Sequence, residues 1–69
     1  MNSPVRSYHL RGGYLLGFRT HRGMTQAEMA AWLGVRPNTV ARWERQEKPL
    51  PPLLALVMAL EENLEETGG

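Results

Sequence analysis

This 69-residue chain contains no cysteine and no long apolar run. The absence of cysteine excludes both a disulfide framework and a thiolate metal site. No segment approaches the roughly 20 apolar residues needed to span a bilayer, and residues 1–10 lack the apolar centre of a signal peptide. We therefore expect a cytoplasmic protein with no membrane partner.

The residues that catalysis requires are scarce as well. The sequence shows no nucleophile–base pair, no phosphate-binding loop and no cluster of metal ligands, because His9 and His21 have no acidic or histidine neighbour at ligand spacing. We expect both histidines to be exposed. A chain of this length forms one small domain without a deep cleft. We therefore expect a protein that is not an enzyme and that uses neither cofactor nor metal.

Charge is distributed unevenly along the chain. Residues 1–48 hold all eight basic side chains and three glutamates, a net charge of +5, whereas residues 49–69 hold four glutamates and no base, a net charge of −4. A polyanion such as DNA would be attracted by the first two-thirds of the chain and repelled by the rest. The alternative, ordinary solvated surface charge, predicts a mixture of signs.

Apolar periodicity and turn residues predict an all-α fold, a compact bundle of four short helices and possibly a fifth. The sequence shows neither internal repeats nor strand-like alternation. We expect a flexible N-terminal arm at 1–10, a DNA-binding domain at 11–65 and a disordered end at 66–69. The expected helices cover 13–22, the stretch between Thr25 and Gly34, 37–46 and 52–65.

The middle of the chain predicts two helices that meet at a tight corner. Thr25 and Glu28 have the spacing of a capping box, which opens a helix, and Gly34 can adopt the positive φ of a turn. Ala30 is small enough for a close helix crossing, and Val40 can fill the angle between the helices. Such a corner presents its second helix to a DNA groove.

Three short motifs in this region resemble the Cro/repressor-type helix-turn-helix family, also called the XRE family. Residues 25–30 (TQAEMA) are similar to its T-Q-x-E-L-A opening, residues 33–35 (LGV) to its turn, and residues 40–44 (VARWE) to the end of its recognition helix. The resemblance covers about residues 10–60. It implies a bacterial or phage DNA-binding regulator folded like the lambda repressor domain.

The resemblance also implies roles for the recognition helix, whose inward residues are expected to be Val40 and Trp43. Arginine can bond the guanine edge and asparagine the adenine edge in the major groove. Arginine is a poor N-cap, so Arg36 is either available to read DNA or marks a slightly different helix start. The base-reading set is Arg36, Pro37, Asn38, Thr39 and Arg42.

Further family roles concern the DNA backbone and the scaffold. Thr25 and Gln26, at the start of the first helix of the corner, are expected to bind phosphate with the help of backbone amides. Arg45 and Lys48 are expected to add phosphate contacts. The resemblance pairs Arg19 with Glu44, which would fix the recognition helix to the preceding scaffold.

The last helix carries more apolar residues than one buried face needs. We expect Leu53, Leu56, Val57 and Leu60 to face the core, which leaves Leu50, Leu54 and Met58 as a second stripe. This second stripe is the predicted homodimer interface, since the chain has no fifth helix of the kind that often pairs in the family. The alternative is that Leu54 and Met58 cover the N-terminal arm.

These observations predict a sequence-specific regulator of transcription, a repressor that binds an inverted-repeat operator on double-stranded DNA as a homodimer. A different class, an antitoxin-type interaction module, would use the apolar last helix to bind a heterologous protein. A stoichiometric heterologous partner would favour that second hypothesis.

Overall fold

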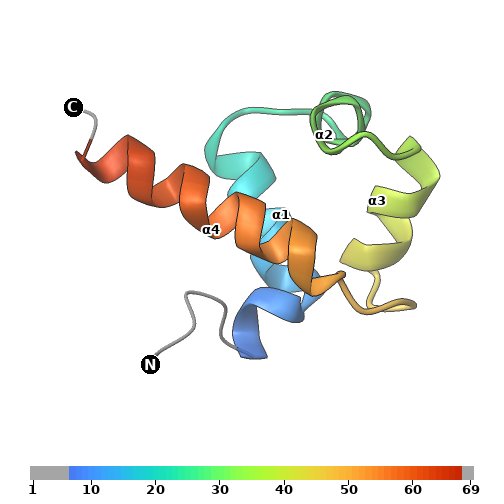
Figure 1. The fold of residues 1–69 in the computed structure, drawn as a ribbon. Helices are drawn as coiled ribbons and strands as arrows, with labels where there is room; N and C mark the ends of the chain where they lie inside the picture. Colours follow the sequence, from blue (N-terminus) through green and yellow to red (C-terminus); the bar gives the residue numbers. More distant parts are fainter. Residues whose placement is uncertain (1–6, 68–69) are drawn as a thin grey trace.

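The computed structural model of the chain describes residues 7–67 (Figure 1). A short 3₁₀-helix, η1 (Ser7–Leu10), precedes four α-helices: α1 (Gly12–His21), α2 (Gln26–Leu33), α3 (Pro37–Glu44) and α4 (Pro52–Thr67). Residues 7–67 contain no β-strand. The predicted all-α fold with four helices is therefore confirmed.

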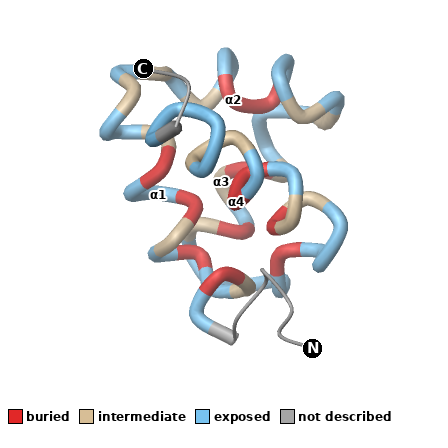
Figure 2. Tube along the Cα trace, turned by 60° about the vertical axis from the view of Figure 1, so that its left-hand side comes forward, coloured by how far each residue is buried: buried red, intermediate tan, exposed pale blue. Residues whose placement is uncertain are grey.

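The helices enclose one apolar core. Helix α2 packs against α3, α3 packs against α1, and α4 contacts η1. Figure 1 shows α4 crossing α1, with the α2–α3 corner to one side, and in Figure 2 buried residues alternate with exposed ones along the chain. The buried apolar side chains are Leu15, Phe18, Met29, Ala30, Val40, Trp43, Leu50, Ala55 and Met58.

The corner residues lie where the sequence placed them. Val40 is completely buried, Ala30 is almost so, and Trp43 belongs to the core. The other tryptophan, Trp32, is half-exposed and stacks on Phe18 with 5.6 Å between ring centroids. The α2–α3 corner therefore has a common core with α1 and cannot rotate against it independently.

The folded unit begins earlier than residue 11. Residues 1–6 of the expected arm lie outside the described residues, but residues 7–10 form η1. His9, expected on the surface, is only 5% exposed, and its ring lies edge-on to Tyr14 at 4.6 Å. The expectation for His9 was wrong because aromatic neighbours bury its ring, whereas His21 is exposed as expected.

The C-terminal end of the domain also differs from the expected boundary. Helix α4 continues to Thr67, so Glu66 is helical, while residues 68–69 lie outside the described residues. Two side-chain contacts tie this acidic half of α4 to α1. The Tyr14 hydroxyl donates to Glu62 at 2.6 Å, and Arg22 forms an ion pair with Glu65 while its guanidinium lies over the Phe18 ring.

The two faces of α4 are the reverse of those expected. Leu50 is 1% exposed and Met58 is fully buried, and Leu54 packs against the core, so the predicted dimer stripe belongs to the interior of the single chain. Leu53, Val57 and Leu60, expected to face inward, are exposed, whereas Leu56 is partly buried. That dimer interface is therefore wrong, because its side chains are already covered within one chain.

The contacts of α4 explain this reversal. The backbone N–H of Leu50 donates to the Leu10 carbonyl at 3.2 Å, which holds the start of α4 against η1. The alternative expectation, in which Leu54 and Met58 cover the N-terminal segment, is the one consistent with this packing. Because apolar residues occur all around the first half of α4, its periodicity could not select the buried face.

The corner helices end in the same hydrogen-bonding motif. At Gly34 (φ 76°), the N–H groups of Gly34 and Val35 donate to the Ala31 and Ala30 carbonyls. After α3 the same motif has Gln46 at the left-handed position, with φ 62°. Helix α3 consequently ends at Glu44 rather than at residue 46. This Schellman motif satisfies the last carbonyls and turns the chain sharply.

Candidate nucleic-acid interface

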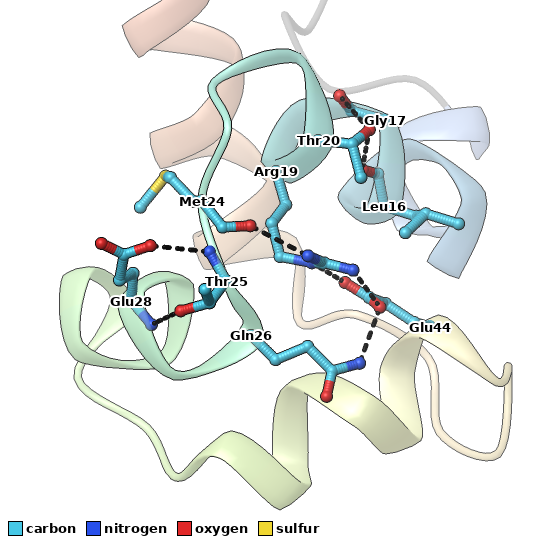
Figure 3. A network of polar contacts seen from close by, with 9 residues as sticks. All are labelled: Leu16, Gly17, Arg19, Thr20, Met24, Thr25, Gln26, Glu28 and Glu44. Atoms are coloured by element: carbon cyan, nitrogen blue, oxygen red, sulfur yellow. Dashed lines mark hydrogen bonds and ion pairs between the residues drawn. The ribbon is translucent and has the colours of Figure 1, made fainter.

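The start of α2 is fixed by a reciprocal cap. The Thr25 hydroxyl accepts a hydrogen bond from the Glu28 N–H at 3.0 Å, and the Glu28 carboxylate accepts one from the Thr25 N–H at 2.8 Å (Figure 3). The predicted capping box is therefore confirmed. It orders the first turn of α2, where Gln26 and the backbone amides would meet a phosphate.

The recognition helix is attached to the scaffold through Glu44. The Arg19 guanidinium donates two hydrogen bonds to the Glu44 carboxylate, from Nε at 2.6 Å and from Nη2 at 3.0 Å. Arg19 also donates to the Met24 carbonyl at 2.9 Å. The Arg19 and Glu44 side chains are 15% and 8% exposed. This two-bond geometry fixes the distance and the rotation between α1 and the end of α3.

Gln26 joins the same network, which the sequence did not indicate. Its side-chain amide donates to the Glu44 carboxylate at 3.0 Å, so α1, α2 and α3 meet at one carboxylate (Figure 3). A glutamine amide carries two N–H groups and one acceptor oxygen. Gln26 can therefore keep its bond to Glu44 and still donate its second N–H to another acceptor.

The electrostatics of this cluster favour the charged pair. Burial raises the pKa of the Glu44 carboxyl, but hydrogen bonds from Arg19 and Gln26 and the charge of Arg19 outweigh burial, so the pKa of Glu44 lies below its ordinary value of 4.5. The hydrogen bond to Glu44 likewise raises the pKa of Arg19. Both side chains are therefore ionised at neutral pH.

The outer face of α3 carries polar and basic side chains. Val40 and Trp43 are buried, whereas Arg36, Asn38 and Arg42 are exposed. Pro37 occupies the first turn, and the preceding Arg36 makes no capping hydrogen bond with its side chain. Thr39 is partly buried. The structure thus places four members of the predicted base-reading set on α3 and Arg36 at the extended position just before it, where the Arg36 side chain makes no capping hydrogen bond.

A second basic cluster follows the end of α3. Arg45 donates to the Glu47 carboxylate at 2.7 Å, and Arg42 lies 3.6 Å from the same carboxylate. The hydrogen bond from Arg45, aided by the charges of Arg45 and Arg42, lowers the pKa of Glu47. Lys48 follows and is exposed. No role was predicted for Glu47 from the sequence, although its position two residues after Arg45 was readable, and its contact with Arg42 emerges only from the structure.

Among residues 7–67, no group of three or more His, Cys, Asp or Glu side chains is arranged to hold a metal ion. No helix within the same residues is long and apolar enough to cross a membrane.

Comparison with known proteins agrees with this geometry. A model of the helix-turn-helix family matches residues 17–65, which include α2, α3 and most of α4. No curated protein and no solved structure gave a match. With a capped α2, a glycine turn at residue 34 and a polar α3 held by Arg19 and Glu44, the chain belongs to the Cro/repressor-type (XRE) helix-turn-helix family of DNA-binding transcription regulators.

Proposed function

We propose that this protein is a transcriptional repressor that binds an inverted-repeat operator on double-stranded DNA as a homodimer. The observation that carries the proposal is the division of α3 into two faces. Val40 and Trp43 anchor one face in the core, while Asn38 and Arg42 are exposed on the other, and Arg36 is exposed just before the helix. A short rigid helix with such an outer face fits the major groove of B-DNA.

Base reading is assigned to the exposed set on α3. Asn38 has the donor–acceptor pair that matches the N6 and N7 edge of adenine, and Arg36 and Arg42 match the O6 and N7 edge of guanine. Thr39 can touch a thymine methyl group, and Pro37 presents only apolar surface. Because α3 is held by Glu44 and by two core residues, these groups approach DNA in a fixed orientation.

Phosphate binding is assigned to residues on either side of α3. Thr25 and Gln26 lie at the start of α2, where backbone amides and the helix dipole favour an anion. Arg45 and Lys48 supply positive charge beyond the end of α3. Contacts of this kind set the register of the protein on DNA without reading sequence.

The reading assignment predicts separable losses of specificity. Binding sites selected from random duplex DNA would define the half-site, and fluorescence anisotropy would then measure binding to its single-base variants. Asn38→Ala and Arg42→Ala should each lose about 1–3 kcal/mol of discrimination, at different base positions. Lys48→Ala is the control, since it should weaken all duplexes alike and lower the salt slope by about 1. Unchanged base preference in both α3 variants would contradict the assignment.

Repression follows from steric exclusion. A domain that occupies DNA within a promoter blocks other proteins from the same base pairs and needs no further contact to do so. In a reporter strain with the selected operator inside the promoter, the wild-type chain should lower expression, and Asn38→Ala/Arg42→Ala should restore it. Increased expression with the wild-type chain would show activation instead.

Glu47 should restrain DNA binding, because it lies beside two arginines assigned to the DNA interface. Its negative charge opposes the phosphates and competes with them for Arg45. Glu47→Gln should therefore raise the affinity for both specific and unrelated duplexes severalfold at low salt. The matched control is Glu66→Gln, the same change in charge on the distant half of α4. Equal effects of the two variants in the anisotropy assay would show that only net charge matters.

A further inference from the structure

The outward face of α4 carries an apolar stripe that the single chain leaves uncovered. Its members are 40–70% exposed, although they are large aliphatic side chains, and they lie opposite the buried Ala55, Met58 and Ala59. We call them the outer stripe: Leu53, Val57, Leu60 and Leu64. None of them belongs to the core cluster.

The spacing of the outer stripe is that of a helix-pairing seam. Successive members are separated by four, three and four residues. Leu53 and Leu60, and likewise Val57 and Leu64, are seven residues apart, which is the heptad spacing of the a and d positions at which two α-helices interlock. A broader apolar stripe is the pattern of a helix that covers a globular core, whereas a narrow one is the pattern of a helix-pairing seam. The stripe therefore fits another α-helix that carries the same narrow seam.

The charges of α4 favour a second copy of α4 in the opposite direction. Its first half, from Pro52 to Leu60, has no charged residue, and its second half has four glutamates, which the dipole of their own helix disfavours. In an antiparallel pair each acidic half lies beside the uncharged amino half of its neighbour. A parallel pair would place both acidic halves together at one end, where the Arg22–Glu65 ion pair offsets one of the four negative charges in each copy.

We infer that two copies of this chain associate through antiparallel pairing of their outer stripes, an inference that rests on the proposed homodimer and specifies its interface. Leu53 of one copy then lies across from Leu64 of the other, and Val57 lies across from Leu60. Each contact occurs twice about the two-fold axis, so one stripe supplies both halves of the interface.

Antiparallel pairing of α4 also separates the two copies of the recognition helix, α3. Helix α4 has 16 residues and is therefore about 24 Å long. Figure 1 shows α3 beside the amino end of α4, so antiparallel pairing places the two α3 helices at opposite ends of the dimer. Parallel pairing would bring those amino ends within about 8–10 Å of each other. Successive major grooves on one face of DNA are ~34 Å apart, which favours the antiparallel arrangement.

Sedimentation equilibrium over a concentration series tests the surface. The wild-type chain should show a monomer–dimer equilibrium, and Leu60→Glu should weaken it about tenfold or more. Leu16→Glu is the matched control, because Leu16 is a similarly exposed leucine on α1. Circular dichroism of both variants should match the wild type. A wild type that is monomeric at every concentration, or a Leu60→Glu variant that dimerises normally, would overturn the inference.

Disulfide trapping tests the direction, and the cysteine-free chain makes each introduced thiol unique. An equimolar mixture of Val57→Cys and Leu60→Cys should oxidise mainly to the mixed dimer if the helices are antiparallel. Parallel helices would give mainly the two self-linked dimers, because a disulfide needs Cα atoms within about 7 Å. A predominance of self-linked dimers would overturn the antiparallel arrangement.

Failure of this interface and failure of the proposed DNA reading are distinguishable. If the outer stripe does not pair, the wild type will still show the base preferences that Asn38→Ala and Arg42→Ala alter. If α3 does not read DNA, the self-association of the free protein and its loss in Leu60→Glu will remain.

Discussion

Gly12→Ala should destabilise the fold severely, because a methyl group has no room at the start of α1. A Cβ at residue 12 would lie 2.0 Å from the Trp43 carbonyl oxygen and 3.0 Å from both the Cα and the carbonyl oxygen of Glu44. These neighbours are main chain and cannot rotate away. The substitution must therefore separate α1 from the end of α3, at a cost of about 3 kcal/mol or more.

Gly13→Ala provides a matched control one residue further on. A Cβ there meets nothing within 4 Å, and residue 13 is exposed in the same helix. Alanine should stabilise this position by about 0.5–1 kcal/mol. Urea unfolding followed by circular dichroism would measure both variants, against a total stability of ~3–10 kcal/mol for a chain of this length. Equal stability of the two would contradict the close approach of α1 and α3.

Glu44→Ala should be the second severe change, since it removes one carboxylate from a network that joins three helices. Arg19 and Gln26 would both lose their partner in a mostly buried position. Breaking such a pair from one side costs about 3 kcal/mol. Glu65→Ala is the control, because the Arg22–Glu65 pair is more exposed on the Glu65 side and should contribute about 1 kcal/mol or less.

The Arg19–Glu44 pair should also make the free energy of unfolding depend on pH in the acid range. The pKa of Glu44 is lower in the folded protein than its ordinary value of 4.5, so its contribution is fully present above pH 4.5 and is lost as the pH falls through the folded value. Glu44→Gln should therefore lose less stability than the wild type on acidification below pH 4.5. Identical acid dependence of the urea midpoints would exclude this contribution.

Local chemistry determined the α2–α3 corner. Thr25 and Glu28 form a cap within one helical turn, and Gly34 supplies a left-handed residue at the turn. Ala30 and Val40 lie at short sequence separation on either side of that turn. Because each of these features depends on neighbours only a few residues away, the sequence was sufficient to place the corner and the exposed face of α3.

The tertiary structure decided which face of α4 is buried. Leucine, valine and methionine surround its first half, so burying either stripe would remove similar apolar area from water. The choice depends first on η1, because the Leu10 carbonyl accepts a hydrogen bond from the Leu50 N–H. It depends also on the hydrogen bond from Tyr14 to Glu62 and on the ion pair between Arg22 and Glu65. None of these partners is near α4 in sequence.

The same distinction applies to the candidate site. The sequence alone determined the basic first two-thirds of the chain, the capped corner and the polar face of α3, since composition and local spacing encode them. Only the tertiary structure placed Gln26 on Glu44, Glu47 beside Arg42, and Gly12 against Trp43. The Gln26–Glu44 hydrogen bond and the close approach of Gly12 to Trp43 depend on how the helices pack. The Glu47–Arg42 contact depends on the left-handed conformation of Gln46, and no short sequence pattern specifies that conformation.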